Sequence, residues 1–126
     1  MYENPNGLIE QLFADFTVEG KKIPVSFLHF NGEPKSVPET YITYQQTSSN
    51  EPLLGDDKLL NYVDFYDFDI FSKGNYIPII EAIKDKLIAN GFMWIPSRSS
   101  GDMYEYDTRY YHKTLCFSIE RSTTNG

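Results

Sequence analysis

The chain has 126 residues, of which 40% are hydrophobic and 16% aromatic, and it carries a formal net charge of −7 at pH 7. This length leaves room for one core of ordinary size, so we expect a single domain over residues 1–126, and the aromatic content excludes a disordered chain. The negative charge excludes direct binding to nucleic-acid phosphates and anchoring to a membrane through basic residues.

Cysteine use and hydropathy indicate the compartment. The one cysteine, Cys116, excludes an internal disulfide and a thiolate zinc cage, and is typical of a reducing compartment. No apolar run approaches the ~20 residues that a membrane span needs, and the first residues lack the basic start of a secretory signal. We therefore expect a soluble protein that is made in the cytoplasm and has no membrane partner.

The first predicted element is a short helix that starts near Pro5 or Asn6, with one apolar face formed by Leu8, Ile9, Leu12, Phe13 and Phe16. Two strands follow, over residues 23–30 and 40–46, and Pro24 predicts that the first begins there or lies at a sheet edge. The polar residues 47–58 predict a loop that is mobile or becomes ordered on a partner.

The third and longest strand spans residues 60–71, and its imperfect alternation predicts a bulge near Tyr66 or a strand that uses both faces. A second helix follows, with Asn75 as its cap and Pro78 in its first turn. Its predicted buried stripe consists of Ile77, Ile80, Ile83 and Leu87. Gly91 then predicts a left-handed stop that folds Phe92 back onto Leu87.

A fourth strand begins at Phe92, and the last strand spans residues 109–121, where apolar and polar residues alternate. Residues 122–126 are predicted to be a frayed tail. The order α-β-β-β-α-β-β predicts an α+β fold, with two helices packed on one face of a mainly antiparallel sheet. The predicted core consists of Leu12, Phe13, Phe16, Ile80, Ile83, Leu87, Leu115, Phe117 and Ile119.

Acidic residues form the densest group of chemically active side chains. Asp64, Asp67 and Asp69, together with Asp56 and Asp57, can be interpreted as oxygen ligands for Mg²⁺ in a small metal-dependent enzyme. They can also be the solvated or interface face of an acidic protein. We favour the interface, because no accompanying histidine or nucleotide-binding loop is present.

The remaining candidates for catalysis are one histidine and the cysteine. His112 lies among Tyr110, Tyr111, Glu105 and Asp107, which can tune a general base, but a hydrogen-bonded strand histidine is the more common case. Cys116 lies mid-strand and is interpreted as an inert packed thiol. We therefore expect no catalytic residue, no metal site and no cofactor.

Four runs between Pro38 and Ile119 carry a family resemblance: PETYITY (38–44), YVDFYDFDIFSKGNY (62–76), the helix IPIIEAIKDKLIANGF (77–92) and YEYDTRYYHKTLCFSI (104–119). The segment Asp56-Asp57-Lys58 also fits. In these runs the chain resembles the tail-terminator, or tail-completion, proteins of long-tailed bacteriophages and related prophages.

The resemblance implies an α+β subunit of the virion that forms a homohexameric ring on the last ring of tail-tube protein. It also implies docking to the head-tail connector or stopper protein, with DNA passing through the ring without specific binding. The alternatives are a head-closure or neck protein of the same virion, the enzyme using Asp64, Asp67 and Asp69, and a regulatory or inhibitor protein with one host partner. The predicted interface residues are Leu53, Leu54, Asp56, Asp57, Asp67, Asp69, Tyr110 and His112.

Overall fold

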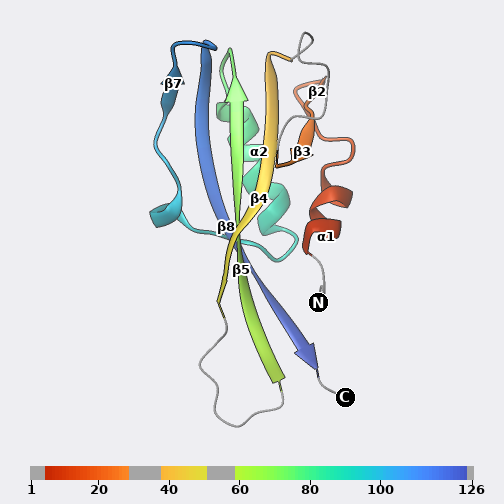
Figure 1. Cartoon of the computed structure of the whole chain (residues 1–126). Coiled ribbons are helices and arrows are strands. Elements are labelled where there is room, and N and C mark those ends of the chain that lie inside the picture. Colours follow the sequence, from red (N-terminus) through yellow and green to blue (C-terminus); the bar gives the residue numbers. More distant parts are fainter. Residues whose placement is uncertain (1–4, 29–37, 51–58, 125–126) are drawn as a thin grey trace.

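Two long strands form the centre of the computed structural model, which describes residues 5–28, 38–50 and 59–124. β5 (Leu59–Ser72) pairs antiparallel with β8 (Tyr110–Thr124), and β4 (Thr40–Asn50) pairs antiparallel with the other side of β5 (Figure 1). Short strands complete the sheet: β3 (Val25–Phe27) lies parallel to β4, while β6 (Met93–Trp94) and β7 (Met103–Glu105) lie antiparallel to the outer edge of β8.

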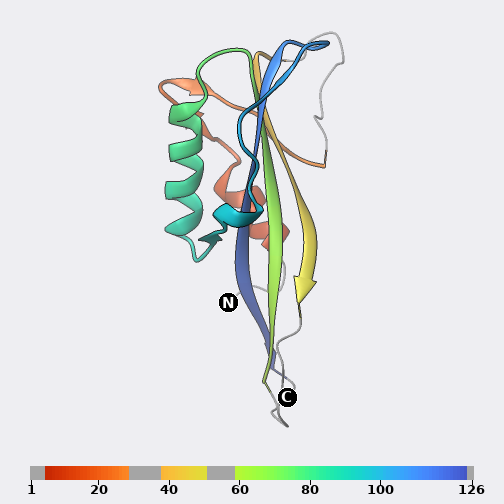
Figure 2. The ribbon, with the colours of Figure 1, turned by 90° about the vertical axis from the view of Figure 1, so that its left-hand side faces the viewer.

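Both helices pack on one face of this sheet. α2 (Ile77–Ile88) lies on that side of the strands (Figure 2). α1 (Pro5–Leu12) leads into Phe13, whose ring centroid lies 5.7 Å from that of Phe68 in β5. The predicted fold class is confirmed: an α+β fold with a mainly antiparallel sheet. None of the helices in the described part of the chain is long and apolar enough to cross a membrane.

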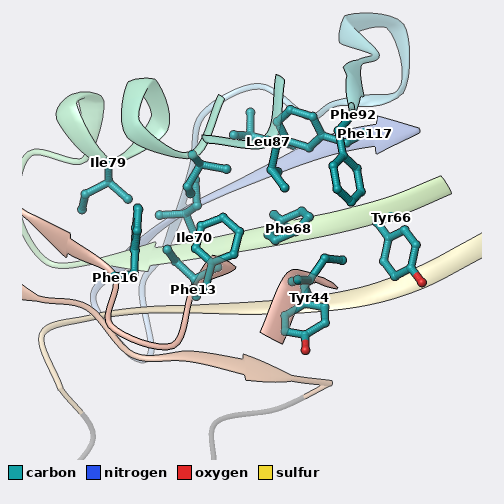
Figure 3. Packing of buried hydrophobic residues seen from close by; sticks show 14 of the residues in the cluster. Phe13, Phe16, Tyr44, Tyr66, Phe68, Ile70, Ile79, Leu87, Phe92 and Phe117 are labelled. Carbon is teal, nitrogen blue, oxygen red and sulfur yellow. The ribbon is translucent and has the colours of Figure 1, made fainter. Parts of the chain in front are cut away.

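The core fills the space between the helices and the sheet (Figure 3). Because side chains alternate along a strand, every second residue in the central part of the three long strands faces it. These residues are Ile42, Tyr44, Tyr66, Phe68, Ile70, Leu115, Phe117 and Ile119. Every residue of the predicted core is buried except Leu12, which is only partly buried against it.

Local sequence determines where α2 ends. Gly91 has a φ of 95°, a left-handed conformation that glycine adopts without steric cost. This turn lets the N–H of Phe92 donate to the carbonyl oxygen of Leu87 at 3.0 Å, and Phe92 is buried in the same cluster as Leu87. The predicted stop and its apolar contact are confirmed.

The start of α2 differs from the prediction in two respects. The N-cap position is Tyr76 rather than Asn75, although the Asn75 side chain accepts a hydrogen bond from the Ile77 N–H at 3.2 Å. Ile77 is 56% exposed, so its place in the buried stripe is wrong. At 3.6 residues per turn it lies roughly 100° around the helix from the centre of the observed stripe, which consists of Ile79, Ile80, Ile83 and Leu87.

The strand predicted over residues 23–30 is shorter and differently paired. Ile23 extends a small hairpin of β1 (Thr17–Val18) and β2 (Lys21–Lys22), since its N–H donates to the Phe16 carbonyl oxygen at 2.9 Å. Only Val25–Phe27 joins the main sheet, at its edge and after Pro24 as predicted. Residues 29 and 30 lie outside the described residues.

The third strand and its neighbours are longer than predicted. β4 continues through residues 47–50, which were predicted to be loop, and Thr47 forms a bulge opposite Tyr66 and Phe65, so the irregularity lies in the partner strand. Residues 122–124, predicted to fray, pair with the start of β5. The predicted fourth strand is reduced to the two residues of β6, after which a 3-10 turn (Pro96–Arg98) leads to β7.

Candidate assembly interface

The sheet face opposite the α-helices, here called the open face, carries the other half of the strand residues. It consists of Tyr41, Thr43, Gln45, Phe65, Asp67, Asp69, Phe71, Tyr110, His112, Thr114, Cys116 and Ser118. Figure 2 shows the sheet nearly edge-on, with α2 on one side only. Because neighbouring strands are in register, these side chains form rows across the sheet.

The first row of the open face is aromatic. Phe71 stacks on Tyr41 of β4 at a centroid distance of 4.8 Å and on His112 of β8 at 4.3 Å. Tyr110 meets Tyr41 edge-on at 5.5 Å and donates its hydroxyl hydrogen to the Pro38 carbonyl oxygen at 2.6 Å. Met103, the register partner of His112 on β7, extends this row and is 42% exposed.

The second row is a hydrogen-bonded network around Asp69. Its Oδ1 accepts from the Thr114 hydroxyl at 2.5 Å and lies 3.2 Å from Nε2 of His112. The other ring nitrogen, Nδ1, lies 3.5 Å from Oε2 of Glu105, whose other carboxylate oxygen, Oε1, accepts from the Thr108 hydroxyl at 2.8 Å. Both nitrogens of His112 therefore face carboxylates, which fix the orientation of the ring.

The third row pairs Asp67 with Cys116. Burial, followed by the charge of Asp67, raises the pKa of the Cys116 thiol to about 11, and the thiol is buried. Burial also raises the pKa of the Asp67 carboxyl, against the lowering effect of its hydrogen bond with Cys116. The thiol therefore stays protonated at neutral pH, and a protonated thiol is a poor nucleophile.

The acidic residues of β5 are divided between the two faces of the sheet. Asp67 and Asp69 lie on the open face, whereas Asp64 is buried on the helix face, where its Oδ1 accepts from the Gln46 amide at 3.4 Å. The three carboxylates therefore do not converge on one ion. Within the described ranges, no group of three or more His, Cys, Asp and Glu side chains is arranged to hold a metal.

A second aromatic surface, exposed at Tyr104, Tyr106 and Tyr111, lies at the end of the sheet near the start of α2. This tyrosine cluster consists of Tyr76, Tyr104, Tyr106 and Tyr111. The Tyr104 ring lies 5.1 Å from Tyr106 and 5.0 Å from Tyr111, and Tyr106 is 85% exposed. Tyr104 and Tyr111 are register partners on the helix side of the sheet, so the cluster and the open face point in different directions.

Polar contacts at the base of the tyrosine cluster hold it in place. The Tyr76 hydroxyl donates to Asp102, which also accepts from the Lys113 ammonium at 3.3 Å. Burial and this hydrogen bond raise the pKa of Tyr76 to about 12, so it remains a donor at any physiological pH. The sequence predictions missed this cluster, although the tyrosine-rich run from Tyr104 to Tyr111 was the available signal.

Of the predicted interface residues, the structure brings Asp67, Asp69, Tyr110 and His112 together on the open face. Leu53, Leu54, Asp56 and Asp57 lie outside the described residues. No protein-family model matches the chain, and no curated protein matches it either.

Proposed function

We propose that the protein is a structural assembly protein of a long-tailed bacteriophage. It forms a homo-oligomeric ring, a hexamer by the resemblance, which terminates the tail tube and joins the tail to the head connector. The resemblance over residues 38–119 supports this proposal, and the α+β fold is the one that the resemblance implies.

The observation that carries the proposal is that aromatic side chains line both faces of one sheet, half-buried beside the exposed Met103 on the open face and exposed in the tyrosine cluster on the helix side. The open face presents its aromatic row and Met103, and the tyrosine cluster lies on the helix side. Tyrosine and methionine are enriched at protein interfaces, where the ring buries area and the hydroxyl keeps a hydrogen bond. A subunit inside a ring, with a tube below and a connector above, needs several different contact surfaces.

The charge of the chain suits a channel for DNA. Each subunit carries −7, so a ring of identical subunits repels the phosphate backbone and lets a genome pass without adhering. The same charge opposes self-association in solution, because like-charged subunits repel one another over roughly 8 Å at physiological salt. Association is therefore expected to strengthen as salt is raised, with the tube end as the natural template.

The decisive experiment combines the purified protein with tail tubes that lack a terminator. Electron microscopy is expected to show one added ring at one end of each tube, and capped tubes are expected to join filled heads. Binding to the head connector without binding to tubes would instead favour the head-closure alternative. A protein that stays monomeric with tubes, connector and raised salt would contradict the proposal.

A further inference from the structure

The strands β4, β5 and β8 continue past both helices as a narrow arm, made of residues 47–50, 59–63 and 120–124 (Figures 1 and 2). Within the part of the chain that the structure describes, neither outer edge of this arm has a partner strand. The pairing of β3 with β4 ends at Tyr44, and the pairing of β6 with β8 ends at Ser118. Such edges are templates for another strand.

Hydrogen bonds above the arm show which backbone groups point outward from β8. The N–H of Cys116 donates outward to the Ser99 hydroxyl at 2.9 Å, and its carbonyl oxygen accepts from the Ile95 N–H at 2.8 Å. The N–H of Thr114 points the same way, to the Ser100 hydroxyl at 2.8 Å. Because backbone direction alternates along a strand, Glu120 and Ser122 also direct their N–H and C=O groups outward.

The same argument applies to the opposite edge, on β4. The Ile42 N–H donates outward to the Pro24 carbonyl oxygen, and the Tyr44 carbonyl oxygen accepts from the Leu28 N–H, both at 2.9 Å. The bulge at Thr47 inserts one residue, and Ser48 then pairs with Phe65. Below the bulge the outward position therefore passes to Ser49, so among the described residues each edge of the arm presents donors and acceptors that no other strand pairs with.

The geometry points to a second copy of this chain as the partner of these edges. On this inference, which rests on the proposed function, the β8 edge of one subunit pairs with the β4 edge of the next. The two edges lie on opposite sides of one sheet, and β4 and β8 run in the same direction because each is antiparallel to β5. A contact between two different edges repeats from subunit to subunit and forms a ring when the rotation between subunits closes.

The charge of the chain favours backbone pairing over side-chain attraction as the chemistry of this contact. Two copies at −7 repel each other, so charge pairing between identical subunits is not a general source of attraction. Hydrogen bonds between strand edges are neutral and short-ranged, and therefore survive when salt screens the repulsion. The sheet then continues from one subunit into the next, with the helices outside the pairing zone.

Substitution of Glu120 provides a matched pair of variants. Glu120→Pro and Glu120→Ala both remove an exposed carboxylate, but only proline removes the outward N–H, and proline is tolerated at sheet edges. Light scattering and electron microscopy at raised salt, with and without tail tubes, are expected to show rings for the wild type and Glu120→Ala. Glu120→Pro is expected to lose them and remain monomeric with an unchanged melting temperature. If Glu120→Pro has a lowered melting temperature, Ser122→Pro is tested in its place, because the Ser122 N–H also points outward.

Mixing two edge variants tests whether the pairing joins two different edges. Ser49→Pro blocks the β4 edge and is expected to be monomeric, like Glu120→Pro. A mixture of the two retains one intact edge of each kind, and is therefore expected to form a 1:1 dimer and no ring. Dimers of Ser49→Pro alone would indicate β8-to-β8 pairing and overturn the inference.

The possible failures are distinguishable. Rings formed equally well by folded proline variants would overturn the edge pairing and leave the proposed function standing. A wild type that never associates would overturn both. Glu120→Pro rings that no longer bind tubes would assign the edge to another protein and so also overturn the inference.

Discussion

The two faces of the central sheet come from the same strands but carry different chemistry. On the helix face, Phe68 and Phe117 are completely buried in the hydrophobic core, where their ring centroids lie 5.7 Å apart. On the open face, the half-buried Phe71 stacks between Tyr41 and His112 beside a network of carboxylates. The alternation of a single strand thus gives the sheet one apolar face that stabilises the subunit and one mixed face, which under the proposed function meets a partner.

The largest effect is expected from truncation on the helix face. Leu87→Ala and Phe117→Ala are expected to lower the free energy of unfolding by roughly 2–5 kcal/mol, because each removes buried contacts and leaves a cavity. Urea unfolding measures this loss. Ile88→Ala is the matched control on the same helix, since Ile88 is exposed and its truncation is expected to change stability by less than about 0.5 kcal/mol. Near-wild-type unfolding of Leu87→Ala and Phe117→Ala would contradict the assignment of these two residues to the core.

A smaller loss of stability is expected on the open face. Phe71→Ala removes two stacked contacts, each worth roughly 0.5–1.5 kcal/mol, without opening a closed cavity. Its effect on assembly is expected to exceed its effect on folding, so ring formation should decrease under conditions where the monomer remains folded. If Phe71→Ala unfolds as easily as Phe117→Ala, the two faces do not differ as argued.

The Cys116 thiol on the open face makes the stability of the fold depend on pH. Its pKa is raised from an ordinary value of 9.0 to about 11, so the folded state holds this proton more tightly than the unfolded state. The resulting stabilisation is complete below pH 9 and is lost as pH rises towards about 11. Melting temperatures across this range are expected to fall more steeply for the wild type than for Cys116→Ser. Parallel curves would show that the thiol is not linked to folding.

The smallest effect is expected from charge removal in the second row. Asp69→Asn keeps the shape of the side chain and one acceptor oxygen for Thr114, and loses the charge beside His112. We expect an intact fold, with a loss of about 1 kcal/mol in the free energy of unfolding. Circular dichroism and urea titration test this, and Asp67→Asn in the neighbouring row provides the comparison. Unfolding of either variant would place these carboxylates among the essential structural residues.

Strong local signals made part of the fold predictable. Gly91 indicated the end of α2, because few residues other than glycine adopt its backbone conformation, and the alternation around Leu115, Phe117 and Ile119 indicated a half-buried strand. The position of Ile77 was not predictable in this way, because a residue near a helix start fits a stripe by spacing alone. Its burial depends on where the helix meets the sheet.

Long-range pairing accounts for most of the remaining differences. Nothing within residues 122–124 reveals that their partners lie at the start of β5, and the parallel pairing of β3 with β4 has no local signature. The open face combines residues from three strands, so the association of Asp69 with His112 and Glu105 appears only when the register is known. The acidic pattern indicated Asp67 and Asp69, but did not show that Asp64 turns to the opposite face.

The position of β8 also affects how the protein is made. β8 lies inside the sheet between β5 and β6, yet it is the last of the described strands to leave the ribosome. Until it emerges, the nascent chain lacks Leu115 and Phe117 and exposes one edge of β5. Folding is therefore expected to be completed only after synthesis of this strand. Chains that terminate before β8 are not expected to acquire the core and will be open to proteolysis.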